Sequence, residues 1–436
     1  MSKIKPQTLR GFRDYLPDIM GPKQQMLDAV ARVFESYGFG PLQTPALEYS
    51  SVLLGKYGDE GDKLLYRFKD NGDRDVALRY DLTVPLARVA AANPHLPKPF
   101  KRYQIAPVWR AESPGRGRYR EFMQCDVDIV GNDSMMADAE CLAVGAATLR
   151  ALGVEQFTLR INNRKLLTGL FDKLGLDQGE AALEVLRVID KLPKIGEAKV
   201  RGLLAEECGL SAEAVDSVFD FLSRDPETLG DFFEGVETGL KGVEELTTVL
   251  DLAKAQGLSD QVAVDLSIAR GLDYYTGTIY ETFLTGMEDI GSVMSGGRYD
   301  GLMSMYGNQP MPSVGISLGV DRLLAALIEM ELVTLRPSPT RVLITNFNDG
   351  MVSHSYTLAS TLRDQGINAE VFLGTPKLKK QLAYANKMKI PFAIVLGPDE
   401  VAEGLAQVKD LSTGGQSKVP VAQIAEVLAA GIPKAG

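Results

Sequence analysis

Two segments, KRYQIAPVWRAE (residues 101–112) and REFMQCDVDIVG (residues 120–131), alternate apolar and polar residues, and this limits the fold strongly. A period of two is typical of β-strands, whose successive side chains point to opposite faces of a sheet. One face would then carry Arg, Asp, Gln and Tyr. Burial of such groups is costly unless each finds a partner, so this face is expected to form a substrate floor.

A third segment, ARGLDYYTGTIYE (residues 269–281), places an arginine, an aspartate and three tyrosines in strand-like sequence. Such a cluster is either a structural polar network or a ligand site. For Tyr274 and Tyr280 we expect ordinary strand aromatics.

Cysteine and histidine are too few to carry the chemistry. Cys125, Cys141 and Cys208 are widely spaced and form no CxxC pair, which argues against a disulfide scaffold or a thiolate zinc site. The two histidines, His95 and His354, make a histidine triad or a histidine-rich metal site improbable. The chemistry is therefore expected on arginine, carboxylate and hydroxyl groups, and any metal should be a hard ion on oxygen ligands.

The charge of the chain is uneven. The net charge is −10, yet the segment from Lys98 to Glu121 carries seven basic residues against two acidic ones. Such a local positive patch suits a polyphosphate. The N-terminus lacks a signal-peptide pattern and no stretch of about 18 uncharged apolar residues occurs, so we expect a cytoplasmic location.

Composition places the 436 residues among ordinary globular proteins with two or three domains. Residues 1–330 mix strand and helix signals, interrupted at 164–258 by Leu-, Ala-, Glu- and Lys-rich runs that predict a helical insertion. The prolines of LVTLRPSPT mark a linker at 331–340. Residues 341–436 alternate strands and helices, which predicts a small α/β domain with a parallel-leaning sheet.

Four motifs carry a resemblance to a known family. FKRYQIAPVWRAESPGRGRYREFMQCDVDIVG (residues 100–131) resembles motif 2 of the class II aminoacyl-tRNA synthetases, and SVGISLGVDRL (residues 313–323) resembles motif 3. ARGLDYYTG and SGGRYDGL resemble the two signature peptides of the histidyl-tRNA synthetases, and the C-terminal stretch resembles their anticodon-binding domain. The likeness covers nearly the whole chain and is weakest in the helical insertion.

The resemblance implies an α+β catalytic domain built on an antiparallel sheet, with a helical insertion and a C-terminal α/β anticodon-binding domain. It implies a ligase that joins histidine to the 3′ end of histidine tRNA through a histidyl-adenylate, with ATP and Mg²⁺. The segment from Arg10 to Pro45 resembles motif 1, a dimer element, so a homodimer is implied as well.

The family's site residues carry over to matching positions of this sequence. Arg270 and Arg110 would be the catalytic cations at the α-phosphate. ATP would be held by Arg110, Glu112, Arg118, Phe122 and Arg322. Histidine would be held by Asp81, Thr83, Gln124, Asp128, Tyr275 and Tyr299.

Each motif also has a simpler interpretation. Arg270 alone is more often a structural ion-pair partner, RGRYR alone a solvated basic loop, and GGRYDGL alone a turn. Lys377, Lys379 and Lys380 either contact tRNA or form an exposed helix face.

The sequence departs from the family's motifs at two places, and two alternative functions remain open. Motif 3 has Asp321 where the family more often carries Glu, and RYDLTVP and RGRYREFMQCDVDI resemble a eukaryotic-style branch. The rivals are the non-catalytic, histidine-sensing regulatory subunit of ATP phosphoribosyltransferase and a synthetase-like tRNA-sensing module. Both tend to lose arginines that are present here.

Overall fold

A computed structural model of the chain describes residues 4–56, 61–176, 179–268, 274–306 and 311–431. It divides into two compact units, one of residues 1–13 and 26–333 and one of residues 14–25 and 334–436. No helix of the described ranges is long and apolar enough to cross a membrane.

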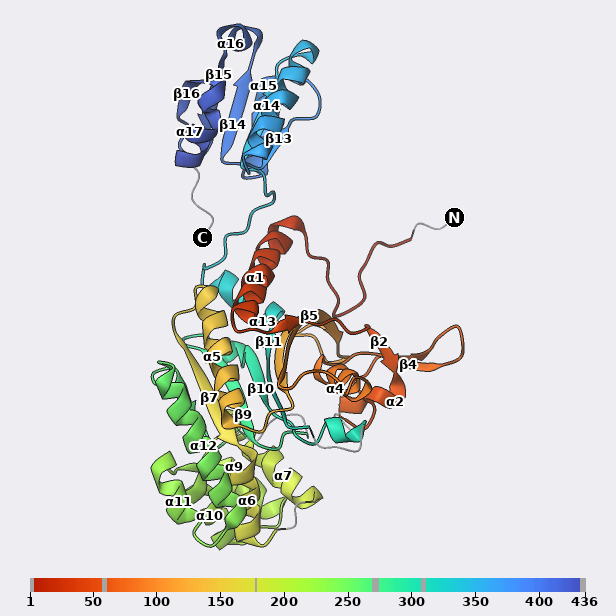
Figure 1. Cartoon of the computed structure of the whole chain (residues 1–436), viewed down its shortest axis with the longest axis vertical. Helices are drawn as coiled ribbons and strands as arrows, with labels where there is room; N and C mark the ends of the chain where they lie inside the picture. Colours follow the sequence, from red (N-terminus) through yellow and green to blue (C-terminus); the bar gives the residue numbers. More distant parts are fainter. Residues whose placement is uncertain (1–3, 57–60, 177–178, 269–273, 307–310, 432–436) are drawn as a thin grey trace. The chain divides into compact units, whose positions relative to one another are not determined.

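The first unit is built on an eight-stranded sheet with the order β1-β5-β6-β11-β10-β9-β7-β8 (Figure 1). Its strands are β1 (Gly40–Pro41), β5 (Phe100–Trp109), β6 (Glu121–Val130), β7 (Phe157–Asn163), β8 (Val262–Val264), β9 (Thr278–Leu284), β10 (Met294–Arg298) and β11 (Ser313–Gly319). The six central strands pair antiparallel, and only the outermost pairs, β1 with β5 and β7 with β8, are parallel. The predicted antiparallel sheet is confirmed.

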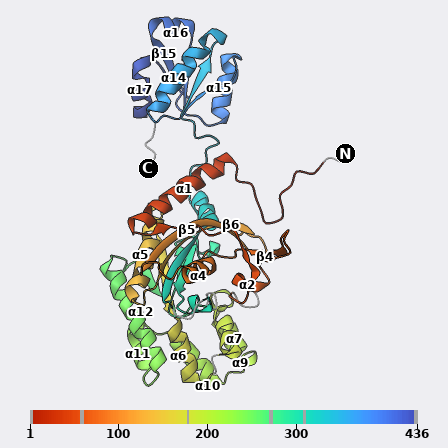
Figure 2. The ribbon, with the colours of Figure 1, turned by 45° about the vertical axis from the view of Figure 1, so that its right-hand side comes forward.

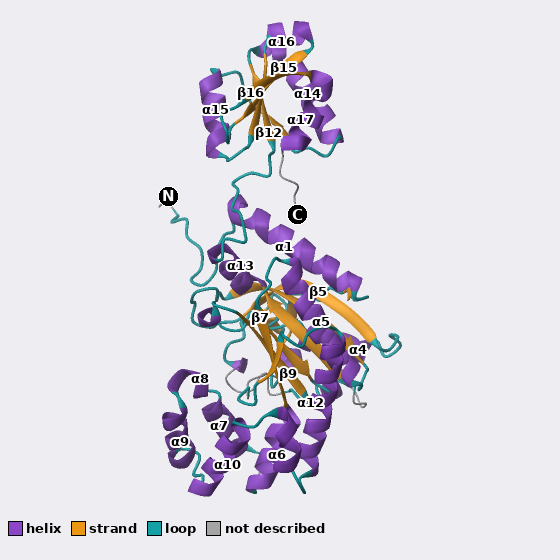
Figure 3. Cartoon of the chain, turned by 90° about the vertical axis from the view of Figure 1, so that its left-hand side faces the viewer, coloured by secondary structure: helices purple, strands orange, loops and turns teal. Residues whose placement is uncertain are grey.

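The two faces of this sheet differ in polarity because of the alternation noted above. Helix α5 (Met135–Ala151) packs on the apolar face, where a side chain at Gly145 would meet Met294 and Ile316. The other face carries the polar residues. Figure 3 shows α5 lying along these strands.

A smaller sheet of β2 (Leu47–Tyr49), β4 (Asp75–Leu78) and β3 (Arg67–Lys69) lies beside the large one. The remaining helices of the unit's sheet region are α1 (Pro17–Ser36), α2 (Ser50–Leu53), α4 (Thr83–Ala92), α13 (Val320–Glu329) and the short 3₁₀ helices η2 (Glu288–Ile290) and η3 (Met303–Met305). Helix α1 spans the boundary between the two units in sequence.

The helices between β7 and β8 form a separate group at one end of the sheet (Figure 2). They are α6 (Arg164–Leu174), α7 (Glu180–Ile189), α8 (Leu192–Ile195), α9 (Glu197–Glu206), α10 (Ala212–Leu222), η1 (Pro226–Thr228), α11 (Leu229–Phe232) and α12 (Glu237–Ala255). Helix α12 packs against both α6 and α5. It comes so close to α6 that a side-chain carbon at Gly169 would lie 2.5 Å from the Cα atom of Gly239.

The second unit contains a five-stranded sheet with the order β13-β12-β14-β15-β16. Its elements are β12 (Val342–Asn346), η4 (Asp349–Met351), α14 (Val352–Asp364), β13 (Ala369–Val371), α15 (Leu378–Lys387), β14 (Phe392–Leu396), α16 (Pro398–Glu403), β15 (Leu405–Asp410), β16 (Gln416–Pro420), η5 (Val421–Gln423) and α17 (Ile424–Gly431).

Helices cover both faces of this second sheet. Side chains of α14 and α17 pack on one face with Val342 and Ile344, and α15 packs on the other with Leu343 (Figure 3). Strands β12, β13 and β14 are parallel, as predicted, whereas β15 and β16 extend the sheet antiparallel. The α/β class of this unit is confirmed, with a sheet that is mixed.

Candidate active site

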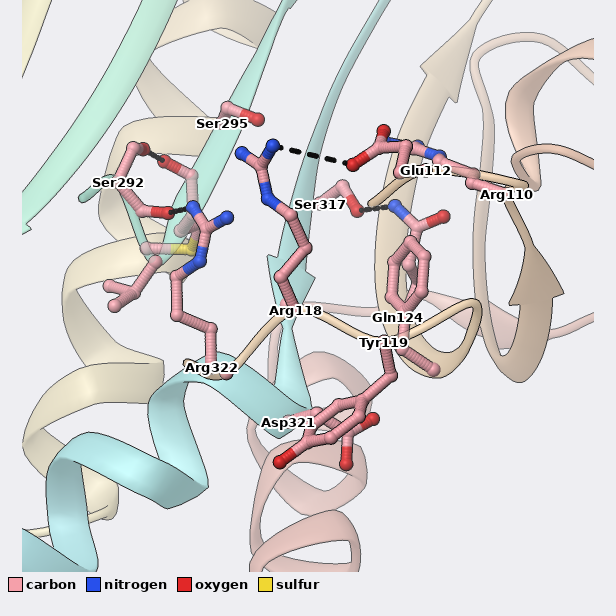
Figure 4. A pocket seen from close by; sticks show the side chains of 15 residues that line it. Arg110, Glu112, Arg118, Tyr119, Gln124, Ser292, Ser295, Ser317, Asp321 and Arg322 are labelled. Atoms are coloured by element: carbon pink, nitrogen blue, oxygen red, sulfur yellow. Dashed lines mark hydrogen bonds and ion pairs between the residues drawn. The ribbon is translucent and has the colours of Figure 1, made fainter. Parts of the chain in front are cut away.

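A cavity opens on the polar face of the eight-stranded sheet, between β6, β11 and the loop that joins β5 to β6 (Figure 4). Six of the residues expected to bind ATP or histidine line it together: Arg110, Glu112, Arg118, Phe122, Gln124 and Arg322. They come from three separate stretches of the chain, and antiparallel pairing of β6 with β11 brings motifs 2 and 3 side by side.

Three arginines converge at this cavity. Arg118 lies 3.4 Å from Glu112, and Arg322 donates a hydrogen bond to the carbonyl of Ser292. Figure 4 shows the side chains of Arg118 and Arg322 extending in the same direction. Burial, followed by the nearby charges, lowers the pKa of Arg322; Arg118 contributes more to this than Arg110 does. The arginine remains charged at any working pH, and both Arg110 and Arg322 donate to backbone carbonyls, which are neutral.

Arg110 is held against two aromatic rings. Its Nε donates to the carbonyl of Tyr80 at 3.1 Å, and its guanidinium carbon lies 4.3 Å from the Tyr80 ring centre and 5.2 Å from that of Phe122. These contacts fix the cation at the cavity wall.

The N-terminal segment braces the loop between β5 and β6. Arg13 donates to the Tyr119 hydroxyl at 2.6 Å and stacks on its ring, while Arg120 donates to the carbonyls of Arg10 and Glu112. The loop that carries Arg118 is therefore tied down on both sides.

Asp321, the shorter residue in motif 3, links α13 to β6. Its carboxylate accepts from the backbone N–H of Met123 at 2.8 Å and faces Arg13 at 3.4 Å. Figure 4 shows it below the arginines, next to Tyr119. Its oxygens are engaged with the protein, which fits a role in holding motif 3 on motif 2.

Cross-strand register places a row of polar side chains across the polar face of the sheet, and two of them, Ser295 and Ser317, line the cavity. Gln104, Asp126, Ser317, Ser295, Glu281 and Arg160 lie opposite one another on successive strands from β5 to β7. Within the row, Ser317 donates to Asp126 and accepts from the amide nitrogen of Gln124 at 2.6 Å.

A second polar cluster lies next to this row on the same face of the sheet, around Asp128, two residues after Asp126 on β6. The Tyr299 hydroxyl donates to Asp128, which also forms an ion pair of 2.7 Å with the fully buried Arg102. Burial raises the pKa of Tyr299 well above its usual value, and the charge of Asp128 adds to the effect. Tyr299 is thus a neutral donor to Asp128.

Asp81 and two tyrosines join this cluster. Asp81 accepts the backbone N–H of Val84 at 3.0 Å at the start of α4, and Tyr274 donates to it at 3.5 Å. The Tyr274 ring packs edge-on against Tyr275 and Tyr299, at 5.2 and 5.8 Å between ring centres. Tyr274 is therefore part of the cluster and lies outside any strand, unlike Tyr280, which is buried in β9 as expected.

Glycines make room for the cluster. A side-chain carbon at Gly315 would lie 2.1 Å from a carboxylate oxygen of Asp128, and one at Gly297 would lie 3.0 Å from the Tyr275 ring. The absence of these side chains lets Asp128 and Tyr275 lie directly on the sheet.

Two further residues were expected to bind the substrates, Thr83 and Arg270. Thr83 is the first residue of α4 and is half-buried. Arg270 lies outside the described residues. Asp126, Ser317, Arg102 and Tyr119 were not expected from the sequence, although the alternation in QCDVD puts Asp126 on the same face as Gln124 and Asp128.

The described residues hold no group of three or more His, Cys, Asp or Glu side chains arranged to bind a metal ion. The cavity offers Glu112 and Asp321 as carboxylates, and Asp321 is already engaged. This donor set fits a magnesium ion held mainly by oxygens of a phosphate substrate.

Comparison with known proteins gives consistent results. A family model described as Histidyl-tRNA synthetase matches residues 11–323, and one described as Anticodon binding domain matches residues 341–430. The histidine–tRNA ligase of Rhodopirellula baltica is 47% identical over 94% of each chain, and that of Wolinella succinogenes is 43% identical over 98% of each.

Among solved structures, the crystal structure of histidyl-tRNA synthetase from Nostoc sp. PCC 7120 is 36% identical, covers 99% of this chain and 100% of its own, and has a TM-score of 0.89. These relatives are bacterial and give no support to the expected eukaryotic-style likeness. The synthetase model spans well over half of the sequence, and the chain therefore belongs to the histidyl-tRNA synthetase family.

Proposed function

We propose that this chain activates histidine with ATP and transfers it to the 3′ end of histidine tRNA. The observation that carries the proposal is the convergence of Arg110, Arg118 and Arg322 on one cavity, beside a buried cluster of carboxylates and tyrosines. The first set suits a polyphosphate and the second suits a small polar cation.

The reaction has two steps. The carboxylate of histidine attacks the α-phosphorus of ATP, a new C–O–P link forms, and pyrophosphate leaves with the electrons of the broken P–O bond. The 3′-hydroxyl of the terminal adenosine then attacks the histidyl carbonyl, loses its proton, and releases AMP.

Fixed cations make the first step possible, because negative charge must be screened at attack and stabilised in the transition state. In this proposal Arg110 and Arg270 meet the α-phosphate and Arg118 and Arg322 hold the outer phosphates. Glu112 and Phe122 contact the adenine. Phe122 is half-buried beside Arg110, so its ring can be shared between the cation and a base.

Histidine recognition needs acceptors for imidazole N–H groups and for the ammonium. We assign Asp81, Thr83, Gln124 and Asp128 to the ammonium side, and Tyr275 and Tyr299 to the ring side. Burial, with the charges of Asp128 and Asp81, raises the pKa of Tyr275, so its hydroxyl stays protonated. A site that demands hydrogen bonds from its substrate rejects analogues lacking them by about 10⁴–10⁵.

Magnesium belongs to the proposal as the partner of ATP. When bound, it would neutralise part of the negative charge of the phosphate groups.

The second unit is assigned to tRNA. Phe347 is 62% exposed and Leu373 is 82% exposed, directly beyond the ends of β12 and β13. Exposed aromatic rings suit unstacked bases, and Lys377, Lys379 and Lys380 are exposed nearby in the sequence. The domain limits at 1–330, 331–340 and 341–436, the homodimer through residues 10–45 and a cytoplasmic location are parts of the same proposal.

The test is ATP–pyrophosphate exchange with purified protein, offering each amino acid in turn. We expect exchange with histidine alone, reduced at least about 100-fold by Arg270→Ala, as for a lost transition-state cation. Arg187→Ala, which removes an exposed arginine from α7, is the matched control and should leave the rate unchanged. Histidine binding by the folded protein without any exchange would reject this function and favour the regulatory paralogue.

A further inference from the structure

A chain of three hydrogen-bonded side chains is buried in the floor of the cavity. Gln124 and Asp126 lie two residues apart on β6, and Ser317 lies opposite Asp126 on β11. The amide nitrogen of Gln124 donates to the Ser317 hydroxyl at 2.6 Å, and that hydroxyl donates to Asp126. Gln124 and Asp126 are 7% and 2% exposed, so water has little access to either group.

Elementary chemistry fixes the direction of this chain. An ionised carboxylate can only accept hydrogen bonds, and a serine hydroxyl has one proton to donate. When the Ser317 hydroxyl donates its hydrogen bond to Asp126, the Ser317 oxygen can only accept a hydrogen bond from Gln124. The amide nitrogen must then face Ser317, and the amide oxygen must face away from it.

The consequence is visible at the amide oxygen of Gln124. Figure 4 shows this oxygen on the side opposite Ser317, in a residue that lines the cavity. It is buried and has no hydrogen-bond partner among the described residues. A buried acceptor without a partner is costly, and a ligand with a cationic donor would remove that cost.

We propose that Asp126 is a positioning residue that, through Ser317, holds the amide of Gln124 with its oxygen toward the α-ammonium group of the amino-acid substrate. This inference rests on the proposed function and adds two residues to it, Asp126 and Ser317, which act through Gln124. We call Asp126, Ser317 and Gln124 the amide relay.

The groups around Asp126 set its charge. Arg102 from β5 favours the carboxylate, whereas Asp128 on the same strand and Asp81 after β4 oppose it; Arg79, also after β4, adds a further positive charge. Burial is the largest influence and raises the pKa of Asp126 to about 7. A protonated Asp126 can donate to Ser317, which permits the reverse direction and turns the Gln124 nitrogen toward the cavity. An arriving ammonium group favours the carboxylate and hence the binding direction.

Asp126→Asn tests the amide relay because asparagine both donates and accepts and no longer imposes a direction. We expect the KM for histidine in ATP–pyrophosphate exchange to rise by about tenfold to a hundredfold, the usual effect of a lost hydrogen bond to a charged group. The KM for ATP should stay the same. The ratio of variant to wild-type histidine KM should grow from pH 6 to pH 8, because Asp126 of the wild type becomes ionised over this range. The titration of histidine itself affects both proteins equally and cancels in the ratio.

A charge-conserving double variant distinguishes loss of Gln124 positioning from a nonspecific structural disturbance of the site. In Asp126→Asn with Gln124→Glu, both oxygens at position 124 are acceptors, so the direction of the relay no longer matters. The histidine KM should return to within about threefold of the wild-type value. Ser317→Ala breaks the same chain at its middle and should reproduce the single-variant effect.

The outcomes are distinct. An unchanged histidine KM in Asp126→Asn, or a double variant no better than the single one, overturns the amide relay. If Asp126→Asn fails to unfold cooperatively on heating, the histidine KM of Ser317→Ala decides in its place, and an unchanged value overturns the relay. Calorimetry with a histidine analogue that lacks the amino group should show equal affinity for wild type and Asp126→Asn; unequal affinity also overturns the relay. Absence of histidine-dependent exchange in the wild type would reject the proposed function instead.

Discussion

At position 126 a carboxyl group lies where its charge is disfavoured. The site is almost fully buried, and this burial, to which Asp128 and Asp81 add negative charge, outweighs the favourable effects of Arg102 and of the Ser317 hydrogen bond. A folded-state pKa of about 7, compared with about 4 in an unfolded chain, means that the folded protein binds this proton more tightly. Stability is therefore lost as the pH rises between these two values.

Asp126→Asn should remove this pH dependence. Below about pH 4 both residues are neutral, while above about pH 7 only the wild type carries the buried charge. The free energy of unfolding of the variant, relative to wild type, should increase by about 4 kcal/mol across this range. Urea unfolding at several pH values measures the difference. A constant difference from pH 4 to pH 8 would show that Asp126 titrates as an exposed carboxyl group does.

Residues with a strong motif context were the easiest to predict. Arg110, Arg118 and Arg322 sit in recognisable motifs, and the cavity brings them together. Asp126 and Ser317 were missed because alternation gives the face on which a side chain lies but not its cross-strand neighbour. That neighbour depends on the register of β6 and β11, in which Asp126 and Ser317 pair although they are 191 residues apart in sequence.

At the scale of elements, strands and helices with clear periodicity were predicted well, and weakly apolar strands were not. Strands β12 and β14 are apolar runs, whereas β15 and β16, LAQVKD and QSKVP, carry few apolar residues. They hold their places through pairing with each other and with β14. Tertiary pairing of this kind overrides local preference.

The contact of α6 with α12 leads to a test of helix packing. Gly169→Ala would place a methyl group 2.5 Å from the Cα atom of Gly239, where backbone has to move. We expect a loss of about 1–3 kcal/mol in the free energy of unfolding.

Gly202→Ala in α9 is the matched control. A carbon added at Gly202 meets nothing within 4 Å, so the better helix propensity of alanine should stabilise the protein by up to about 1 kcal/mol. Chemical denaturation of both variants compares them. Equal effects of the two substitutions would contradict the close packing of α6 on α12.

At the scale of the whole molecule, the two units are proposed to have different functions. Activation of histidine would need only side chains of the first unit, because every residue that lines the cavity belongs to it. Recognition of tRNA would need the second unit as well. The two steps of the reaction should therefore respond to different substitutions.

Phe347→Ala tests this division. Removal of a ring on which a base can stack costs about 1–3 kcal/mol, so kcat/KM for tRNA charging should fall about tenfold or more. Histidine-dependent pyrophosphate exchange should not change. Tyr356→Ala removes another exposed ring of the same unit, on α14, and should alter neither rate. A parallel loss of exchange in Phe347→Ala would contradict the separation of the two steps.

The close approach of Asp128 to Gly315 has a consequence for how this site can vary. The carboxylate occupies space that any side chain at position 315 would need, so motifs 2 and 3 share one small volume although they are distant in sequence. Any side chain at position 315 requires a smaller residue at position 128, and a residue larger than aspartate at 128 cannot be matched at 315, which is already glycine. The two motifs can therefore be redesigned for another amino acid only as a pair.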